Sequence, residues 1–405
     1  MISLAWRNLW RQPRRTLLTV AVIALAGMVT VFLLALQQGS YATMRNNTLS
    51  VFDGFAQIQQ PDYLDDPSLR KSISQPDDLA LSIEQIAGVD TVSARGATYA
   101  LLSRGQHSVG AFIVGVQPER EKKVSSIARS LRNGQYLNPG NQAEVVLGEA
   151  LARNLGVGIG DRITLLGTSR EGAVAADVLT VQDIFNSGVS TLDRQLAQIP
   201  LPRFQQDFAM QGLVNALVVS GKGLKEVQAS LPEIEHAVSP KGLQVRTWKD
   251  LEPGLASAIQ LDASTSMLWY ISLVVVVVVL LLNTLLMSVL ERTREFGVLL
   301  ALGMRDGAIG QMVWLELLLL LGLGLAAGIA LGGGLAYWYS IEGMALPGAE
   351  GVFSQWGLPS RLYPQVSAFS LLTGPLAIAI TTVIAGYFPY LRIHRLRPVP
   401  AMRAA

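Results

Sequence analysis

Apolar residues gather in four long blocks along the chain, at residues 17–36, 267–290, 309–339 and 366–390. Each block reaches the roughly 20 apolar residues that an α-helix needs to cross a lipid bilayer. Residues 37–266 instead mix polar and apolar positions, as a water-soluble domain does. The pattern therefore predicts four transmembrane helices, with one large soluble domain inserted between the first and the second.

The inserted segment contains signals for both strands and helices. Residues 145–148 predict a strand, 149–155 a helix, and 161–166 a second strand after a glycine-rich turn. Further strands are predicted at 51–60, 92–103, 109–116, 177–184 and 214–220, and further helices at 76–87 and 120–132. The polar segment at 61–76, which has a proline at each end, predicts a loop.

Basic residues mark one side of the predicted spans. They precede the first span, separate the second from the third and follow the fourth, at positions 7, 11, 14, 15, 292, 294, 305, 392, 395, 397 and 403. Because basic loops stay in the cytoplasm, we expect residues 1–16, 291–308 and 391–405 to be cytoplasmic and residues 37–266 and 340–365 to lie outside. The first block exceeds the roughly 7–15 apolar residues of a cleaved signal peptide, so we expect it to remain as an anchor.

Composition argues against several classes of function. The chain has no cysteine, which excludes disulfides, thiolate metal sites and a cysteine nucleophile. His107, His236 and His394 are far apart in sequence and lack the spacing of metal ligands. Neither a phosphate-binding GxxxxGK[ST] loop nor a GxSxG nucleophile motif is present. With a net charge of +2 and no basic patch interleaved with aromatic residues, we expect no nucleic-acid partner, and no catalytic, metal or cofactor site in this chain.

The first residues predict an amphipathic helix in the plane of the membrane interface. Its apolar side chains follow helical spacing at Ile2, Trp6, Leu9 and Trp10, and the arginines, including Arg11 and Arg14, fall elsewhere. Pro13 is expected to end or turn this helix before the first span. An alternative interpretation makes the same residues a polar beginning of that span.

Residues 291–308 follow the second span directly and favour a short helix. Apolar positions share one face of it: Phe296, Leu299, Leu300 and Gly303. Charged residues occupy other positions: Glu291, Arg292, Arg294 and Glu295. Such a helix, with an aromatic anchor beside charges, can dock in a groove on a soluble partner. A solvated helix that binds nothing explains the pattern equally well, and spacing alone does not choose between the two.

Small and polar residues inside the spans indicate where helices pack. The third span repeats glycine every four residues at Gly324, Gly328 and Gly332, and a second row of small residues runs through Gly322, Ala326, Ala330 and Gly334. Such rows let helix backbones approach closely. Glu316 in this span needs a partner such as an arginine, and we favour a structural role over proton transport. Asn283 in the second span is likewise expected to hold helices together.

Five segments carry a family resemblance. They are LAWRNLWRQPRRTLLT at the start, NTLLMSVLERTREFGVLLALGM after the second span, WLELLLLLGLGLAAGIALG in the third, PYLRIHRLRPVPAMRA at the end and VVLGEALARNLGVGIGDRITLL in the soluble domain. With these segments the chain resembles the FtsX-like permeases of ABC transporters, a group that includes LolC, LolE and MacB. The second segment is the most specific of the five.

The resemblance implies a bacterial inner-membrane permease with four transmembrane helices and a mixed α/β periplasmic domain. It gives residues 291–303, with Thr293 and Gly297 among them, the role of a coupling helix that docks on an ATPase. Leu300 departs from the family, which often has an arginine there. MacB carries its ATPase fused at the N-terminus, whereas this chain starts at the interfacial helix. A separate cytoplasmic ATPase dimer holding ATP and magnesium is therefore expected, with a second permease copy, identical or a sister subunit.

Three functions follow as alternatives. Family members use ATP-driven motion to extract or expel lipoproteins or other amphiphiles from the inner membrane, in some cases toward a periplasmic acceptor or adaptor. Others transmit force to their periplasmic domains and activate a cell-wall hydrolase without moving cargo. A membrane-anchored enzyme is disfavoured because no acid, base and nucleophile constellation is present. The size of the inserted domain and its LolE-like pattern favour transport.

Overall fold

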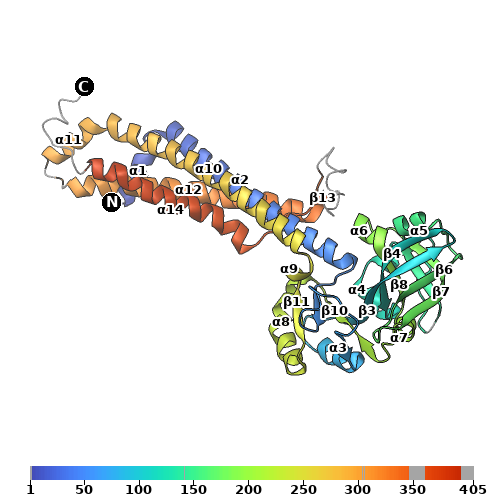
Figure 1. The fold of residues 1–405 in the computed structure, drawn as a ribbon. Coiled ribbons are helices and arrows are strands. Elements are labelled where there is room, and N and C mark those ends of the chain that lie inside the picture. The colour runs from blue at the N-terminus through green and yellow to red at the C-terminus, as the bar shows by residue number, and fades with distance from the viewer. Residues whose placement is uncertain (1, 141, 303, 305, 346–360, 394–405) are drawn as a thin grey trace. The chain divides into compact units, whose positions relative to one another are not determined.

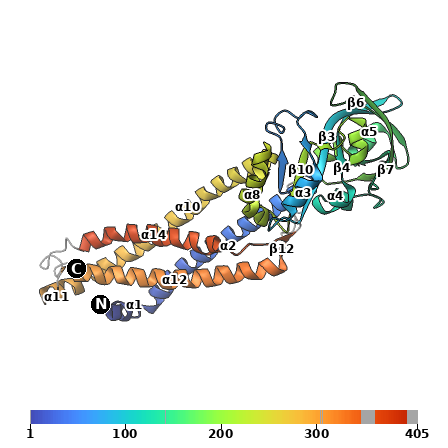
Figure 2. The same ribbon diagram turned by 90° about the horizontal axis from the view of Figure 1, so that it is seen from below.

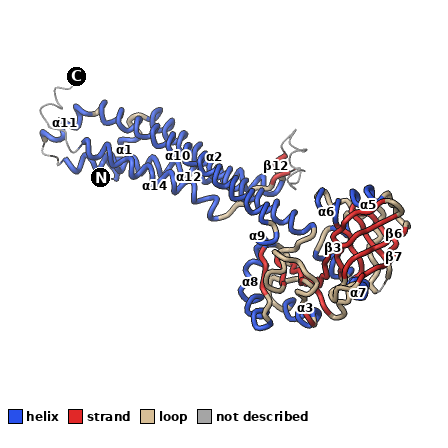
Figure 3. Tube along the Cα trace, in the orientation of Figure 1, coloured by secondary structure: helices blue, strands red, loops and turns tan. Residues whose placement is uncertain are grey.

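The computed structural model describes residues 2–140, 142–302, 304, 306–345 and 361–393. The chain divides into two compact units. Among the described residues, the membrane unit comprises 2–42, 258–302, 304, 306–345 and 361–393, and the head unit comprises 43–140 and 142–257. Helices dominate the described part of the membrane unit, whereas most strands belong to the head unit (Figure 3).

The described helices of the membrane unit include four that are long and apolar enough to cross a membrane (Figure 1). These are α2 (Pro13–Val51), α10 (Pro253–Glu291), α12 (Asp306–Glu342) and α14 (Ala368–Ile393). Two shorter helices are α1 (Ile2–Leu9) and α11 (Thr293–Ala301), and two short strands pair between α12 and α14, β12 (Met344–Ala345) and β13 (Arg361–Leu362). Helices α12 and α14 lie side by side in both ribbon views (Figure 2).

The helix ends differ from the ends of the apolar blocks. Helix α2 continues beyond the first block to Val51, and α10 begins at Pro253, ahead of the second block. Hydropathy marks where a helix leaves lipid, whereas helix-forming polar residues extend it further. Because α2 extends to Val51, the strand predicted at 51–60 is shortened to β1 (Ala56–Gln59). For the same reason the head unit is shorter than the expected insertion at 37–266.

A common apolar core holds the membrane unit together. It draws buried residues from α1, α2, α10, α12 and α14: Leu9, Ile23, Ala26, Val274, Val277, Leu281, Leu320, Leu321, Leu325 and Ile378. Other apolar side chains of these helices are exposed in the isolated chain, such as Leu18 and Ile384. An outward-facing apolar surface is what a helix in contact with lipid requires.

Glycines let α12 approach α2 closely. The three glycines of the first row all face α2: Gly324, Gly328 and Gly332. A Cβ atom at Gly328 would lie 2.8 Å from the carbonyl oxygen of Ala24, and one at Gly332 would lie 2.7 Å from that of Met28. Only glycine fits such an approach without moving the backbone. The second row faces outward, since a Cβ atom at Gly334 would meet no neighbouring atom within 4 Å.

The head unit is built on one nine-stranded sheet. Its strands are β1, β3 (Thr91–Arg104), β4 (His107–Val116), β5 (Glu144–Gly148), β6 (Arg162–Thr168), β7 (Val174–Phe185), β8 (Leu196–Pro200), β10 (Ala216–Ser220) and β11 (Gln244–Thr247). Their order is β11-β1-β10-β3-β4-β8-β5-β7-β6, with β3 also paired to β6. The pairs β4–β8 and β5–β7 are parallel, and the other pairs are antiparallel. A separate two-stranded sheet pairs β2 (Ile73–Ser74) with β9 (Leu213–Val214).

Short helices complete the head unit. They are α3 (Pro76–Glu84), α4 (Pro118–Val124), α5 (Glu149–Leu155), α6 (Ser190–Gln195), α7 (Leu201–Asp207), α8 (Leu224–Val238), α9 (Trp248–Leu251) and the 3₁₀ turns η1 (Ile127–Arg129) and η2 (Ser239–Lys241). Helix α5 has the predicted bounds. The helix predicted at 120–132 is instead split into α4 and η1, because Ser125 is extended and the Ser126 amide donates to the carbonyls of Ser50 and Val51.

Candidate functional site

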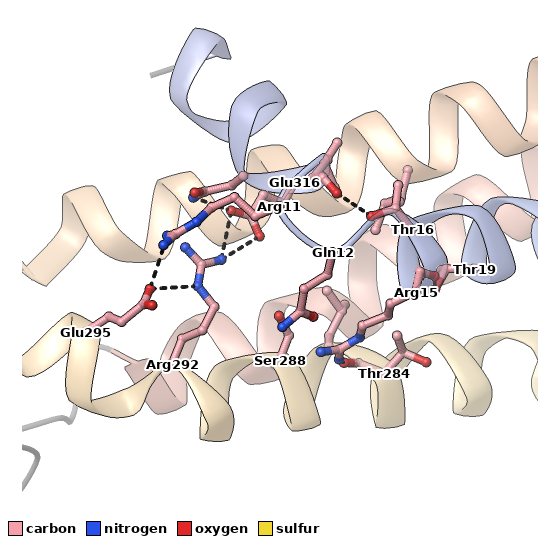
Figure 4. A pocket seen from close by; sticks show the side chains of 14 residues that line it. Arg11, Gln12, Arg15, Thr16, Thr19, Thr284, Ser288, Arg292, Glu295 and Glu316 are labelled. Carbon is pink, nitrogen blue, oxygen red and sulfur yellow. Dashed lines mark hydrogen bonds and ion pairs between the residues drawn. The ribbon is translucent and has the colours of Figure 1, made fainter.

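A pocket of about 270 Å³ lies within the membrane unit where α1, α2, α10, α11 and α12 meet (Figure 4). Polar and charged side chains make up most of its lining: Asn8, Arg11, Gln12, Arg15, Thr16, Thr19, Thr284, Ser288, Arg292, Glu295 and Glu316. Both segments that the sequence singled out, 1–16 and 291–303, therefore contribute to one pocket. We call it the coupling pocket.

Glu316 of α12 is the buried charge of the coupling pocket, with 7% of its surface exposed. Its carboxylate accepts hydrogen bonds from Arg292 Nη1 at 3.1 and 3.3 Å and from Asn8 Nδ2 at 2.8 Å. A buried carboxylate is tolerated when a cation and further donors compensate it. The arrangement joins α1, α12 and the junction of α10 with α11 through one side chain.

Two further ion pairs attach the same junction to the N-terminal segment. Arg15 Nη1 lies 3.0 Å from Glu291 Oε2, and its other terminal nitrogen donates to the carbonyl oxygen of Thr284. Glu295 Oε2 lies 3.4 Å from Arg292 Nε and 3.5 Å from Arg11 Nη1. In Figure 4, Arg292 lies between the carboxylates of Glu295 and Glu316. These exposed pairs are individually weak, but together they fix the orientation of α11.

Phe296 is buried, which differs from the surface position expected for it on α11. The sequence pattern made this residue an aromatic anchor for a partner, yet it is 1% exposed. It packs in an apolar cluster of this chain with Val289, Ile309, Met312 and Val313, and the Arg292 guanidinium carbon lies 5.2 Å from its ring centroid. Helical periodicity identifies an apolar face but does not say which partner covers it. The anchor therefore fastens α11 to α12.

The exposed side of α11 carries other residues. Arg294 and Val298 lie on α11, and Leu302, which directly follows its last residue, continues their four-residue spacing; its amide donates to the carbonyl oxygen of Val298 at 3.0 Å. Val298 is 47% exposed and Leu302 79% exposed. We call these three residues the outer face of α11. Gly297 is buried, and Thr293 donates to the carbonyl oxygen of Val289. The side chains of Leu299 and Leu300, and all of Gly303, lie outside the described residues.

Helix α1 and the residues directly after it carry both exposed and buried side chains. Trp6 and Trp10 are exposed, with ring centroids 5.9 Å apart, and Arg11 and Arg14 are exposed as well. Leu9 differs from the expectation, because it is buried in the core of the membrane unit. Leu9 also ends α1, and its carbonyl oxygen accepts the Thr16 hydroxyl at 2.5 Å. Pro13 opens the next helix.

Asn283 is exposed in the described part of the chain. It lies on the exposed side of α10, as do Val279 and Met287 four residues to either side. A helix-joining role for Asn283 would therefore need another chain. Among the described residues, no group of three or more histidine, aspartate and glutamate side chains is placed to hold a metal ion.

A second pocket of about 340 Å³ lies between α2 and α10 at the other end of these helices, and sequence reasoning did not identify it. Its walls are mostly apolar, with Leu33, Leu36, Trp269 and Leu362. Four of its polar side chains form one hydrogen-bonded group: Gln37, Tyr41, Asp262 and Tyr270. Tyr41 donates to Asp262 Oδ2 at 2.5 Å, and Tyr270 donates to Gln37 Oε1 at 3.2 Å. We call it the α2–α10 pocket. The sequence feature that could have pointed to this pocket is Asp262, an acidic residue shortly before the apolar block at 267–290.

Comparison with protein families assigns both parts of the chain. Residues 16–234 match the MacB-like periplasmic core domain, and residues 267–398 match the FtsX-like permease C-terminal domain. The chain is an FtsX-like permease with a MacB-like periplasmic core domain. The resemblance found in the sequence is thereby confirmed, as is a fold of four long apolar helices with a mixed α/β domain between the first and the second. It is a multi-pass membrane protein of the ABC transporter permease class.

Individual proteins are similar to different shares of this chain. The permease is 24% identical over 330 residues to the lipoprotein-releasing system transmembrane protein LolC of Xylella fastidiosa (strain 9a5c), covering 75% of each chain. It is 34% identical over 137 residues to the macrolide export ATP-binding/permease protein MacB of Burkholderia cenocepacia (strain HI2424), covering 34% of this chain and 18% of that protein. The periplasmic region of MacB from Actinobacillus actinomycetemcomitans aligns with 12% identity and a TM-score of 0.34, covering 50% of this chain and 92% of that structure.

Proposed function

We propose that this permease is the membrane subunit of an ABC transporter that extracts or expels lipoproteins or other amphiphiles from a bacterial inner membrane. The α11 segment docks on a cytoplasmic ATPase dimer, which binds ATP and magnesium. A second permease copy, identical or a sister subunit, completes the membrane part. ATP hydrolysis moves the α11 segments, and α2 and α10 pass the motion to the head units, with a periplasmic acceptor or adaptor receiving the cargo.

The attachment of α11 is the observation that carries this proposal. On one side, Phe296 and the Arg292–Glu316 ion pair fasten α11 to α12. On the other side, the outer face presents Val298 and Leu302 to solvent. An apolar helix face flanked by charges is the kind of surface that fits a groove on a soluble protein. Force applied to this face would reach the long helices through the ion pairs of the coupling pocket.

Charged substitutions on the outer face test the docking. The double variant Val298→Asp and Leu302→Asp should lose co-purification with a co-expressed cognate ABC ATPase, because two charges would be buried without partners in the interface. Membrane insertion and thermal stability should not change, since both side chains are exposed. Val174→Asp is a matched control, because Val174 is 77% exposed in the head unit. Retention of the ATPase by a folded double variant would refute the docking assignment.

The α2–α10 pocket supports an amphiphilic cargo. Apolar walls with one hydrogen-bonded group of polar side chains match a molecule that has an apolar chain and a polar end. The names of the relatives agree with this class, since one releases lipoproteins and the other exports macrolides. The tyrosine, aspartate and glutamine side chains of this group would contact the polar end of such a molecule.

Photo-crosslinking tests the cargo class directly. A photo-reactive amino acid at Leu33, which lines the α2–α10 pocket and is 42% exposed, should capture a triacylated lipoprotein in membranes that contain the ATPase. The same amino acid at Leu331, 58% exposed on α12 and outside this pocket, serves as the control. Equal capture at both positions would reflect bulk lipid and contradict the proposal. ATPase stimulation by a cell-wall hydrolase, with no captured lipoprotein, would favour force transmission instead.

A further inference from the structure

The head unit contains a small pocket that the transport mechanism does not use. It has a volume of about 190 Å³ and lies against β1, β3 and β4 and the residues that follow α2. Its polar residues are Asp53, Gln57, Gln59 and Arg95, and its aromatic residues are Phe52, Tyr63, Tyr99 and Phe112. We call it the head pocket. Its volume is below the roughly 300–1,000 Å³ of pockets for drug-sized ligands, which makes it too small for a whole lipid or lipoprotein.

A buried amide gives the head pocket an unused hydrogen-bond acceptor. Gln59 is 2% exposed, and its Nε2 donates to Gln57 Oε1 at 2.7 Å. Gln59 Oε1 has no hydrogen-bond partner among the described residues. A buried polar atom without a partner is rare in folded proteins, because losing hydrogen bonds to water costs free energy. A ligand that brings an O–H or N–H donor would satisfy this oxygen.

The charges around the head pocket are compensated within the protein. Arg95 donates to both carboxylate oxygens of Glu121, at 2.6 and 3.0 Å, and both residues are buried. Burial and the neighbouring Glu252 carboxyl, with which Asp53 shares a hydrogen bond, raise the pKa of Asp53 to about 7. The proton of this pair lies in the hydrogen bond between the Asp53 and Glu252 carboxyls, so a ligand would meet carboxyl oxygens of Asp53 as acceptors. An anionic ligand would find the Arg95 guanidinium already paired with Glu121.

Aromatic rings form the walls of the head pocket. Tyr99 on β3 and Phe112 on β4 are direct cross-strand partners, with ring centroids 5.1 Å apart. Tyr99 is 66% exposed, whereas Tyr63 is 7% exposed. An exposed ring beside buried polar groups offers a flat apolar face next to hydrogen-bonding groups.

We propose that the head pocket binds one neutral, hydroxyl-rich sugar ring of a glycan. The apolar C–H face of a pyranose would stack on Tyr99, and its hydroxyls would donate to Gln59 Oε1 and to a carboxyl oxygen of Asp53. A sugar ring carries several hydroxyls that point in different directions, which matches one carboxyl and two amides around one small volume. A neutral tyrosine side chain, by comparison, carries one hydroxyl donor. Compensation of Arg95 by Glu121 disfavours an anionic ring.

Binding of neutral trisaccharides to the purified full chain in lipid nanodiscs tests this proposal. Saturable binding of triacetylchitotriose or maltotriose is expected by saturation-transfer NMR, without ATPase or nucleotide. Tyr99→Ala should weaken binding about fivefold, which is the middle of the range for one aromatic contact. Because Tyr99 is exposed, its removal should leave the fold intact. Leu101→Ala, 39% exposed on the same strand two residues later, should bind like the unchanged protein.

Gln59→Leu provides an independent readout of the buried acceptor. It should weaken binding of the trisaccharides, since the hydroxyl that bonds Oε1 would lose its acceptor, and thermal unfolding measured in parallel separates this from misfolding. No saturable binding of either trisaccharide would overturn the proposal. Equal affinity of the Tyr99→Ala and Leu101→Ala variants would overturn it too, as would saturable binding of a tyrosine-containing peptide in place of the sugars.

Discussion

Arg292 is the residue on which the attachment of α11 depends most. Its side chain contacts the buried Glu316, the exposed Glu295 and the ring of Phe296. It thereby joins a segment proposed to meet the ATPase to a helix inside the membrane unit. Removing a cation from a buried carboxylate leaves that carboxylate uncompensated, which costs more than the pair itself contributes.

Arg292→Ala should destabilise the membrane unit by about 2–3 kcal/mol, somewhat below the loss for a fully buried pair because the side chain is 18% exposed. Adding Glu316→Gln should recover part of this loss, because the neutral amide needs no cation and keeps its contact with Asn8. Thermal unfolding of the four proteins of this double-mutant cycle measures the coupling. If the double variant is no more stable than Arg292→Ala alone, the pair has no such role.

Asp53 should make the stability of the head unit depend on pH. Its pKa is raised from 3.8 to about 7, mainly by burial and then by Glu252, with Arg95 acting in the opposite direction. Between these values the folded state binds more protons than the unfolded state, so the free energy of unfolding falls as pH rises from about 4 to about 7. Asp207, whose pKa burial and Asp177 also raise to about 7, acts in the same sense.

Asp53→Asn should therefore reduce, without abolishing, the loss of head-unit stability between pH 5 and pH 8. Hydrogen exchange of peptides from β3 and β4 in the full chain measures the stability of this unit separately from the membrane unit. Adding Asp207→Asn to this variant should reduce the pH dependence of head-unit stability further, because the pKa of Asp207 is raised in the same direction. An unchanged pH dependence in the Asp53→Asn variant would mean that its carboxyl is not held in the neutral form.

At the scale of elements, the sequence predicted those features that depend on residues close together in the chain. The spans, α5 and the glycine row on α12 follow from hydropathy, caps and spacing. The split at Ser125 and the burial of Phe296 do not, because both depend on residues distant in sequence: Ser50 and Val51 for the first, Ile309 and Met312 for the second. For the same reason the α2–α10 pocket and the head pocket were not predicted, since their linings come from several elements.

The glycine rows of α12 allow a test of helix packing with a built-in control. Gly328→Ala should lower the thermal stability of the membrane unit, because its Cβ atom would lie 2.8 Å from the Ala24 carbonyl oxygen on α2. Gly334→Ala should leave stability unchanged or raise it by up to about 1 kcal/mol, since alanine favours a helix and nothing is in its way. Equal effects of the two substitutions would contradict the close approach of α2 and α12.

At the scale of the whole molecule, two helices belong to both compact units. Helix α2 begins in the membrane unit and ends in the head unit, and α10 does the reverse. Continuous backbone hydrogen bonding makes such helices suited to passing motion along the chain. The proposal that ATP hydrolysis moves the head units depends on this continuity and on the docking of the outer face of α11.

A single cysteine at Leu302 tests the central claim most directly, because the chain has no other thiol. In intact spheroplasts, Leu302→Cys should resist an impermeant maleimide and should form a cross-link to the ABC ATPase through a short thiol-to-amine reagent added to inverted vesicles. Val174→Cys in the head unit should show the opposite: labelling from outside and no cross-link. Labelling of Leu302→Cys from outside, without any cross-link to the ATPase, would contradict the account.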